Sequence, residues 1–143
     1  MIYGYIIVTK SGLLVRYRFF GRFTSVDDEK ISLLATGITA LLDFFTTVSG
    51  APLETALGGN YKMSIVSRGD IVFAVLTDRN DAMGEVLANK YSIMFTKRLS
   101  EQNIDLSVVM EELLNKILND LFEALDREIE ELNEKSKSFR YIS

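Results

Sequence analysis

Val8–Phe20, "VTKSGLLVRYRFF", joins two strand-like runs through a turn at Lys10, Ser11 and Gly12. A lysine and a serine beside a glycine also occur in phosphate-binding loops. Such a loop needs glycines before the lysine and a helix after the serine, whereas a strand follows here. The stretch therefore predicts a β-hairpin in which Gly12 supplies the positive φ angle of the turn.

The two strands of this hairpin differ in their hydrophobic patterns. Ile2–Thr9 is apolar on both alternations, as expected of a central strand that is covered on both faces. Leu13–Phe20 instead places Arg16 and Arg18 on one face. Two charges in an otherwise aromatic strand predict an edge of the sheet.

A long helix is predicted after the hairpin. Thr24 or Ser25 can cap it, and three acidic residues follow where the helix dipole favours anions. Gly50 ends the helix just before the only proline, Pro52. Apolar residues recur at helical spacing and predict a stripe that faces the core: Ile31, Leu34, Ala35, Ile38, Leu41, Leu42 and Phe45.

The second half of the chain adds three strands and two helices. "PLETALGG" is a weak strand, and its two glycines mark either a bulge or the next turn. Strands on either side of a tight turn at 68–70 follow, and the second, Ile71–Leu76, is continuously apolar. A helix over about 82–99 has Met83, Val86, Leu87, Tyr91, Met94 and Phe95 as buried candidates.

The last helix runs over about 105–137 and becomes highly charged toward its end. It opens at Asp105 or Ser107, and its end either projects from the body or packs on a partner. Its apolar face consists of Val109, Met110, Leu113, Leu114, Ile117, Leu118, Leu121, Leu125, Ile129 and Leu132.

The resulting order is β-β-α-β-β-β-α-α, an α+β fold in the form of an α/β/α sandwich. The two strands that are apolar throughout should be neighbours at the centre. A five-stranded antiparallel sheet with strand order 2-1-5-4-3 meets this condition through hairpins 1–2, 3–4 and 4–5. The first helix then covers one face, and the C-terminal helices cover the other. We expect one domain over residues 1–143.

Composition excludes several classes of function. The 143 residues contain neither cysteine nor histidine, which excludes Ser-His and Cys-His mechanisms and thiolate metal sites. No acid–base constellation appears, so we expect neither an enzyme nor a cofactor or metal site. The net charge of −4 argues against nucleic acid as a partner.

One segment, Ile31–Leu53, is apolar enough to be considered as a membrane span. It contains a single charge, Asp43, but its apolar residues lie mostly on one face, which favours an amphipathic helix buried in a soluble protein. Neither a basic leader nor a cleavage site is visible at the start of the sequence. We therefore expect a cytoplasmic protein. Few prolines and no cysteine or histidine would suit an archaeal source.

This order of elements resembles the longin domain and its relatives, the roadblock domains and adaptor small subunits. The resemblance rests on "TKSGLLVRYRFF", on the helix with "LLATGITALLDFF", and on the strand-turn-strand "YKMSIVSRGDIVFAVLTD", and it covers roughly residues 1–100. The longin pattern is favoured because the helix that usually opens a roadblock domain is missing. The resemblance implies a non-catalytic platform that dimerises or binds a small GTPase, a trafficking protein or another longin- or roadblock-type subunit.

Two groups of residues are candidates for contact with partners. On the first helix, Leu33, Gly37, Ala40 and Phe44 form a second line beside the core stripe. This line either widens the core, is covered by the 49–59 loop, or forms a helix-to-helix homodimer or partner interface. Glycine within a helix costs about 1 kcal/mol relative to alanine, so close approach of another backbone is a reason to keep it.

The second group is a basic strip of Arg16, Arg18 and Arg22. These arginines either keep an edge strand soluble or contact an acidic partner or an anionic membrane surface, to which three charges give only weak attraction. The main hypothesis for function is therefore a dimerising interaction module of longin type. The alternative is a small-molecule sensing domain of profilin- or PAS-like shape, which needs a cavity between helix and sheet.

Overall fold

The computed structural model describes residues 1–104 and 111–142, and in the last helix the side chains of residues 112–136. Over these residues it contains the predicted five strands and three α-helices, in the predicted order. The elements are β1 (Ile2–Thr9), β2 (Leu14–Phe19), a short 3-10 turn (Gly21–Phe23), α1 (Asp28–Ser49), β3 (Thr55–Gly58), β4 (Tyr61–Arg68), β5 (Ile71–Asp78), α2 (Met83–Glu101) and α3 (Glu111–Ile142).

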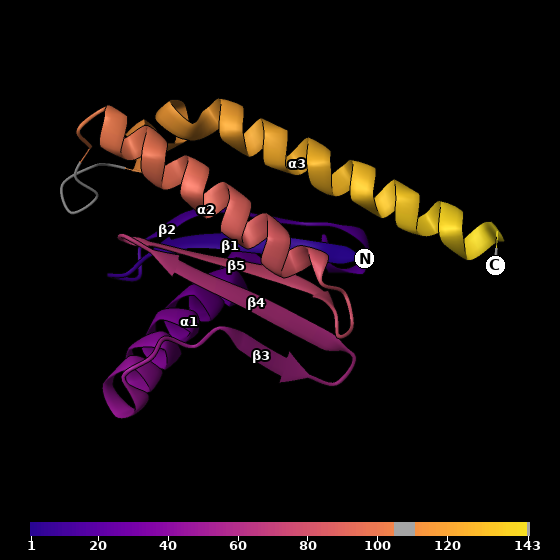
Figure 1. Cartoon of the computed structure of the whole chain (residues 1–143), viewed down its shortest axis with the longest axis horizontal. Coiled ribbons are helices and arrows are strands. Elements are labelled where there is room, and N and C mark those ends of the chain that lie inside the picture. The colour runs from indigo at the N-terminus through magenta and orange to yellow at the C-terminus, as the bar shows by residue number, and fades with distance from the viewer. Residues whose placement is uncertain (105–110, 143) are drawn as a thin grey trace.

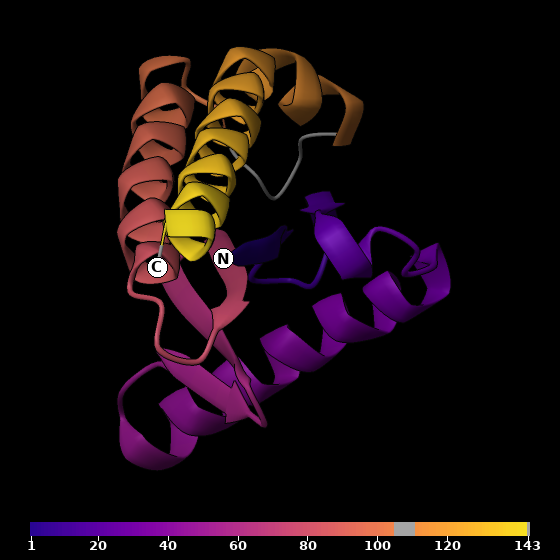
Figure 2. The ribbon, with the colours of Figure 1, turned by 90° about the vertical axis from the view of Figure 1, so that its right-hand side faces the viewer.

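The strands form one antiparallel sheet in the order β2-β1-β5-β4-β3, which confirms the predicted topology. The helix α1 crosses one face of this sheet, and α2 and α3 lie side by side on the other (Figures 1 and 2). The α+β sandwich is therefore confirmed, with the first helix on one side and the C-terminal helices on the other.

The turns follow the predicted glycine chemistry. Gly12 has a φ of 95°, and its N–H donates to the carbonyl of Thr9 at 2.9 Å, which closes the first hairpin. Gly59 has a φ of 59° and lies in the turn between β3 and β4. The two glycines of "PLETALGG" therefore mark the end of β3 and the next turn, and the alternative of a bulge is wrong.

The start of α1 differs from the prediction. Its N-cap is Asp27, whose carboxylate accepts a hydrogen bond from the N–H of Lys30 at 2.8 Å. Thr24 instead closes the short turn that follows β2, with its hydroxyl and its N–H both directed to the carbonyl of Gly21. The other end of α1 is as predicted, because Gly50 is left-handed with a φ of 75°.

Two apolar layers hold the helices to the sheet. Between the sheet and α2/α3, the rings of Tyr5, Phe73 and Phe95 stack in sequence at centroid distances of 5.8 Å, and Phe95 meets Phe122 edge-on at 5.4 Å. Phe122 is fully buried, although the pattern analysis of the last helix did not include it. On the opposite face, α1 buries Ile31, Ala35, Ile38 and Leu42 against Ile6, Val8, Ile65, Val72 and Ala74.

Four residues predicted to lie in the core are exposed. Leu41 and Phe45 of α1 are 50% and 40% exposed, because α1 meets the sheet through a narrower stripe than its sequence provides. Val86 of α2 and Leu113 of α3 also lie on outer flanks. The predicted contacts of Val109 and Met110, and the predicted helix start at Asp105 or Ser107, fall outside the described residues.

Candidate interaction surface

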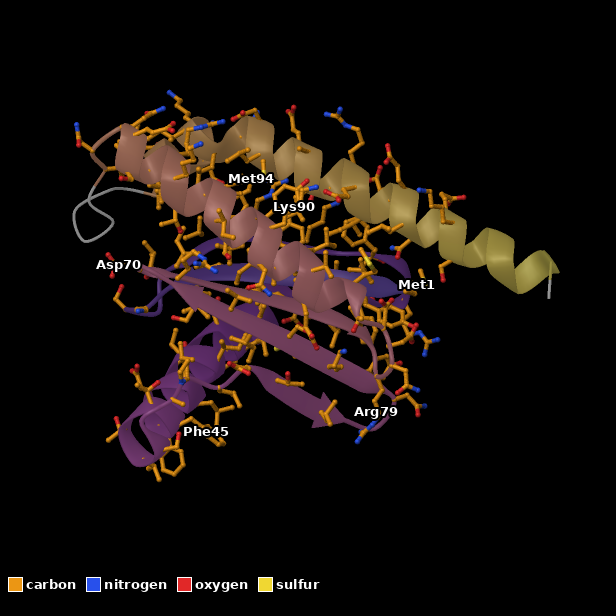
Figure 3. The ribbon with its side chains drawn as sticks, in the orientation of Figure 1. Met1, Phe45, Asp70, Arg79, Lys90 and Met94 are labelled. Atoms are coloured by element: carbon orange, nitrogen blue, oxygen red, sulfur yellow. The ribbon has the colours of Figure 1, made fainter. Side chains whose placement is uncertain are left out.

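The predicted second line of α1 lies on the surface of the molecule. Leu33 and Phe44 are 69% and 59% exposed, Ala40 is also exposed, and Val48 extends the line at 70% exposed. The end of α1 that carries these last residues is remote from α2 and α3, and the neighbouring Phe45 projects there (Figure 3). We call Leu33, Gly37, Ala40, Leu41, Phe44 and Val48 the α1 patch.

The glycine within the patch has no internal reason to be a glycine. A Cβ atom added to Gly37 would have no described atom within 4 Å, so no neighbour in the chain comes close enough to exclude a side chain. The residue therefore costs helix stability without improving the packing of this chain.

Beside the patch is an apolar groove of about 550 Å³. Leu33, Gly37 and Leu41 form one wall, and Leu57 of β3 stands on the other, itself 54% exposed. The floor is formed by side chains of the sheet: Tyr61, Met63, Ile65 and Leu76. The groove was not predicted, because it depends on the angle at which α1 crosses the sheet.

The arginines of the candidate basic strip form hydrogen bonds and ion pairs within the chain. Arg16 donates to the Tyr5 hydroxyl and to the Asp126 carboxylate of α3, both at 2.9 Å. Arg18 pairs with Asp126 and with Glu130 at 2.9 Å each. Burial and the hydrogen bond to Asp126 raise the pKa of Tyr5 above its ordinary value. The first two arginines therefore fasten α3 to the sheet, and their contact with an acidic partner stays a prediction.

Arg22 belongs to a separate aromatic cluster. Its guanidinium donates to the hydroxyl of Tyr61 at 3.0 Å and lies 5.8 Å from the centre of the Tyr3 ring. These two rings and that of Phe23 pack edge to face at centroid distances of 5.3 to 5.5 Å. The rings fill the space between one another, so the cluster is a packed corner of the fold.

The aspartates before α2 have a second partner besides the helix. Asp81 accepts the N–H of Met83, the first residue of α2, at 2.9 Å. The N-terminal ammonium group of Met1 pairs with Asp78 at 2.9 Å and with Asp81 at 2.8 Å. Burial lowers the pKa of this ammonium, but hydrogen bonds to both aspartates outweigh burial and raise it above its ordinary value.

Other functions find less support in the geometry. In the described part of the chain, no group of three acidic side chains is arranged to hold a metal ion. The sensing alternative needs a cavity with several polar groups that converge on a ligand. The groove beside α1 is open, and Tyr61 is the one polar side chain among the residues that line it, which disfavours this alternative. Of the described helices, α1 is long and apolar enough to cross a membrane by length and composition. It packs on the sheet through its buried stripe.

No family model matches the sequence, and a search of curated proteins finds no match. Among solved structures, a Roadblock/LC7 domain from Streptomyces avermitilis is similar, with 12% identity and a TM-score of 0.52 over 72% of this chain and 87% of that chain. The chain has a longin- and roadblock-type fold. The fold predicted from the sequence is thereby confirmed.

Two further similar structures have lower TM-scores. MglB of Myxococcus xanthus is 16% identical, with a TM-score of 0.47 over 87% of this chain and 79% of that chain. A chain of the AP-3 complex is 15% identical, with a TM-score of 0.47 over 96% of this chain and 98% of that chain. At such identities the likeness concerns the fold alone.

Proposed function

We propose that this protein is a non-catalytic protein–protein interaction module that associates with a second copy of itself through the α1 patch. The observation that carries the proposal is the exposed apolar line on α1 beside an apolar groove. Isolated exposed apolar residues are common, but a contiguous group of them marks an interaction site. The unexplained mid-helix glycine supports the same surface, since it permits another backbone to approach closely.

A second copy is the occupant that the chemistry of the patch favours. Between Ile31 and Ser49 the helix carries a single charge, Asp43, which lies on a different flank from the patch. A two-fold axis brings the same surface of each subunit together, so a patch without charges meets itself without repulsion. The open outer edge of β3 lies next to the groove and adds backbone groups that a symmetric partner can pair with.

In this proposal the dimer is a cytoplasmic platform that binds or regulates a small GTPase or a trafficking-like complex. This class of partner is what the longin and roadblock resemblance implies, and it is independent of the dimer test below. A pull-down from the source organism with mass spectrometry tests it. Recovery of a small GTPase or of longin-type subunits would support the proposal, and recovery of unrelated enzymes alone would contradict it.

The dimer is tested by Gly37→Glu and light scattering. The space around Gly37 accepts a side chain, so the variant should fold and its solution mass should fall from twice the chain mass of 16.2 kDa to that mass. Ser32→Glu is the matched control, because it adds the same charge at an exposed position of α1 that has no patch residue three or four positions away. An unchanged mass for Gly37→Glu, with circular dichroism that shows a folded chain, excludes this face as the dimer interface.

A further inference from the structure

A second cleft lies at the edge of the sheet, between α2 and the segment that leads into β3. Its volume is about 360 Å³, and the second half of β4 lines it. Clefts of this order hold small ligands or a few residues of a peptide. Unlike the groove beside α1, it is lined largely by polar residues, which include Glu54, Thr55, Ser67, Arg68 and Asn89.

Part of the outer edge of β4 is open within this cleft. β3 pairs with β4 only over Tyr61–Ser64, and the N–H of Ile65 then donates to the carbonyl of Glu54 at 2.8 Å. Figure 1 shows β3 beside only the half of β4 nearest their common turn. Backbone groups alternate in direction along a strand, so the N–H and C=O of Ser67 point to the same outer edge as those of Ile65.

These two groups of Ser67 have no hydrogen-bond partner among the residues that the structure describes. The chain before Glu54 leads to Pro52, which has no N–H to offer. A donor and an acceptor at a strand edge form a template for one more strand. The cleft therefore offers a short site for strand pairing between α2 and the 52–55 segment.

The charges at the two ends of the cleft differ in sign. Arg68 has one hydrogen bond, from its Nε to the Ser92 hydroxyl at 3.4 Å, so its terminal nitrogens are available within the described structure. Glu85 also lines the cleft, but its carboxylate pairs with Lys62 at 3.3 Å and not with Arg68. Glu54 lies at the other end of the cleft, beside Ile65 of β4. Ile65 precedes Arg68 by three residues, which corresponds to about 10 Å at the rise of a strand.

We propose that this cleft binds an extended peptide that runs parallel to β4, pairs with the backbone of Ser67 and places a carboxylate against Arg68. An arginine fork binds a carboxylate through two parallel hydrogen bonds, which is stronger than a bond between neutral groups. Glu54 sets the direction, because it repels a carboxylate at the far end and attracts an amino group there. Strand addition and carboxylate capture are both established modes of peptide recognition.

The test is a titration of the ¹⁵N-labelled chain with the tetrapeptide Thr-Val-Thr-Val, followed by NMR. We expect a Kd of about 1 mM or tighter and shifts at the amides of Ser67, Arg68 and Asn89. A peptide with an amidated C-terminus should bind about tenfold more weakly. An amidated peptide that ends in aspartate distinguishes the two sources of the carboxylate: restored binding indicates a side chain, and weak binding indicates the chain end.

Two variants separate the two contacts. Arg68→Gln should weaken binding about tenfold. Its matched control is Arg127→Gln, which removes a positive charge from an exposed position on α3 and should leave binding unchanged. Ser67→Pro removes the outward N–H without touching the bonds between β4 and β5, and should also weaken binding.

The proposal is overturned if the parent chain shows no binding at several times the expected Kd, if the acid and the plain amide bind equally, or if the parent and Arg68→Gln bind equally. Asp70 marks the turn at the open end of β4, beside which the shifts should gather (Figure 3). Shifts confined to other parts of the fold also contradict it. None of these results depends on whether the α1 patch forms a dimer.

Discussion

Asn133 is the residue whose removal should be most costly for its size. It lies in α3 and is 6% exposed. Its side-chain amide pairs with the backbone of Ile2 at both ends: Oδ1 accepts the N–H of Ile2 at 2.9 Å, and Nδ2 donates to the carbonyl of Ile2 at 2.9 Å. The backbone bonds between β1 and the chain of β2 stop at Tyr3, whose carbonyl accepts the N–H of Phe20 at 2.7 Å, and Asn133 bonds the next residue, Ile2.

The expected cost follows from these two bonds. Asn133→Ala leaves the N–H and the C=O of Ile2 without these partners, and Ile2 itself is 1% exposed. A buried polar group without a partner costs about 1–3 kcal/mol. We therefore expect the free energy of unfolding to fall by about 2–5 kcal/mol, a large part of the roughly 5–15 kcal/mol typical of a domain.

The measurement is urea unfolding followed by circular dichroism, at one protein concentration for all variants because association would add to stability. Asn119→Ala is the matched control. Its side chain is exposed, bonds only to Glu123 at 3.2 Å among the described contacts, and lies in the same helix. Both substitutions gain the same helix propensity, so their difference isolates the contact with Ile2. A difference below about 0.5 kcal/mol would refute the reasoning.

Two further predictions concern the region where α2 begins and the chain starts. A Cβ atom at Gly84 would lie 2.9 Å from the Cγ2 of Thr77. Gly84→Ala should therefore lower the free energy of unfolding by about 1–3 kcal/mol, although alanine has the better helix propensity. A higher melting temperature for this variant would contradict the prediction. The pKa of the Met1 ammonium is raised in the folded chain above its ordinary value of 8.0. The stability that this group contributes is therefore complete below pH 8 and is lost as pH rises through the folded pKa, so the urea midpoint should fall as pH rises above 8. Asp81→Asn should show a smaller fall, and an equal fall in both proteins would exclude the ammonium as the cause.

The fold was predictable because its signals are local. The continuous apolar runs of β1 and β5 identified the two central strands, and the arginines of β2 identified an edge. Gly12 and Gly50 occupy left-handed backbone positions that other residues rarely adopt, so the turn and the helix end could be located from single residues. Together these features left few alternatives to the observed strand order.

The candidate sites were predictable only in part. The exposed line on α1 follows from helical spacing alone, which is why Leu33 and Phe44 were found. The roles of Arg16 and Arg18 did not follow, since their partners Asp126 and Glu130 lie more than a hundred residues away in the chain.

Sequence by itself determined which residues form strands and helices, because periodicity and turn chemistry act over a few neighbouring residues. Tertiary structure alone decided what the surfaces are. The angle at which α1 crosses the sheet opens the groove beside β3, and the shortness of β3 leaves Ser67 at an open edge. Both are consequences of how whole elements pack, and no local pattern of side chains encodes them.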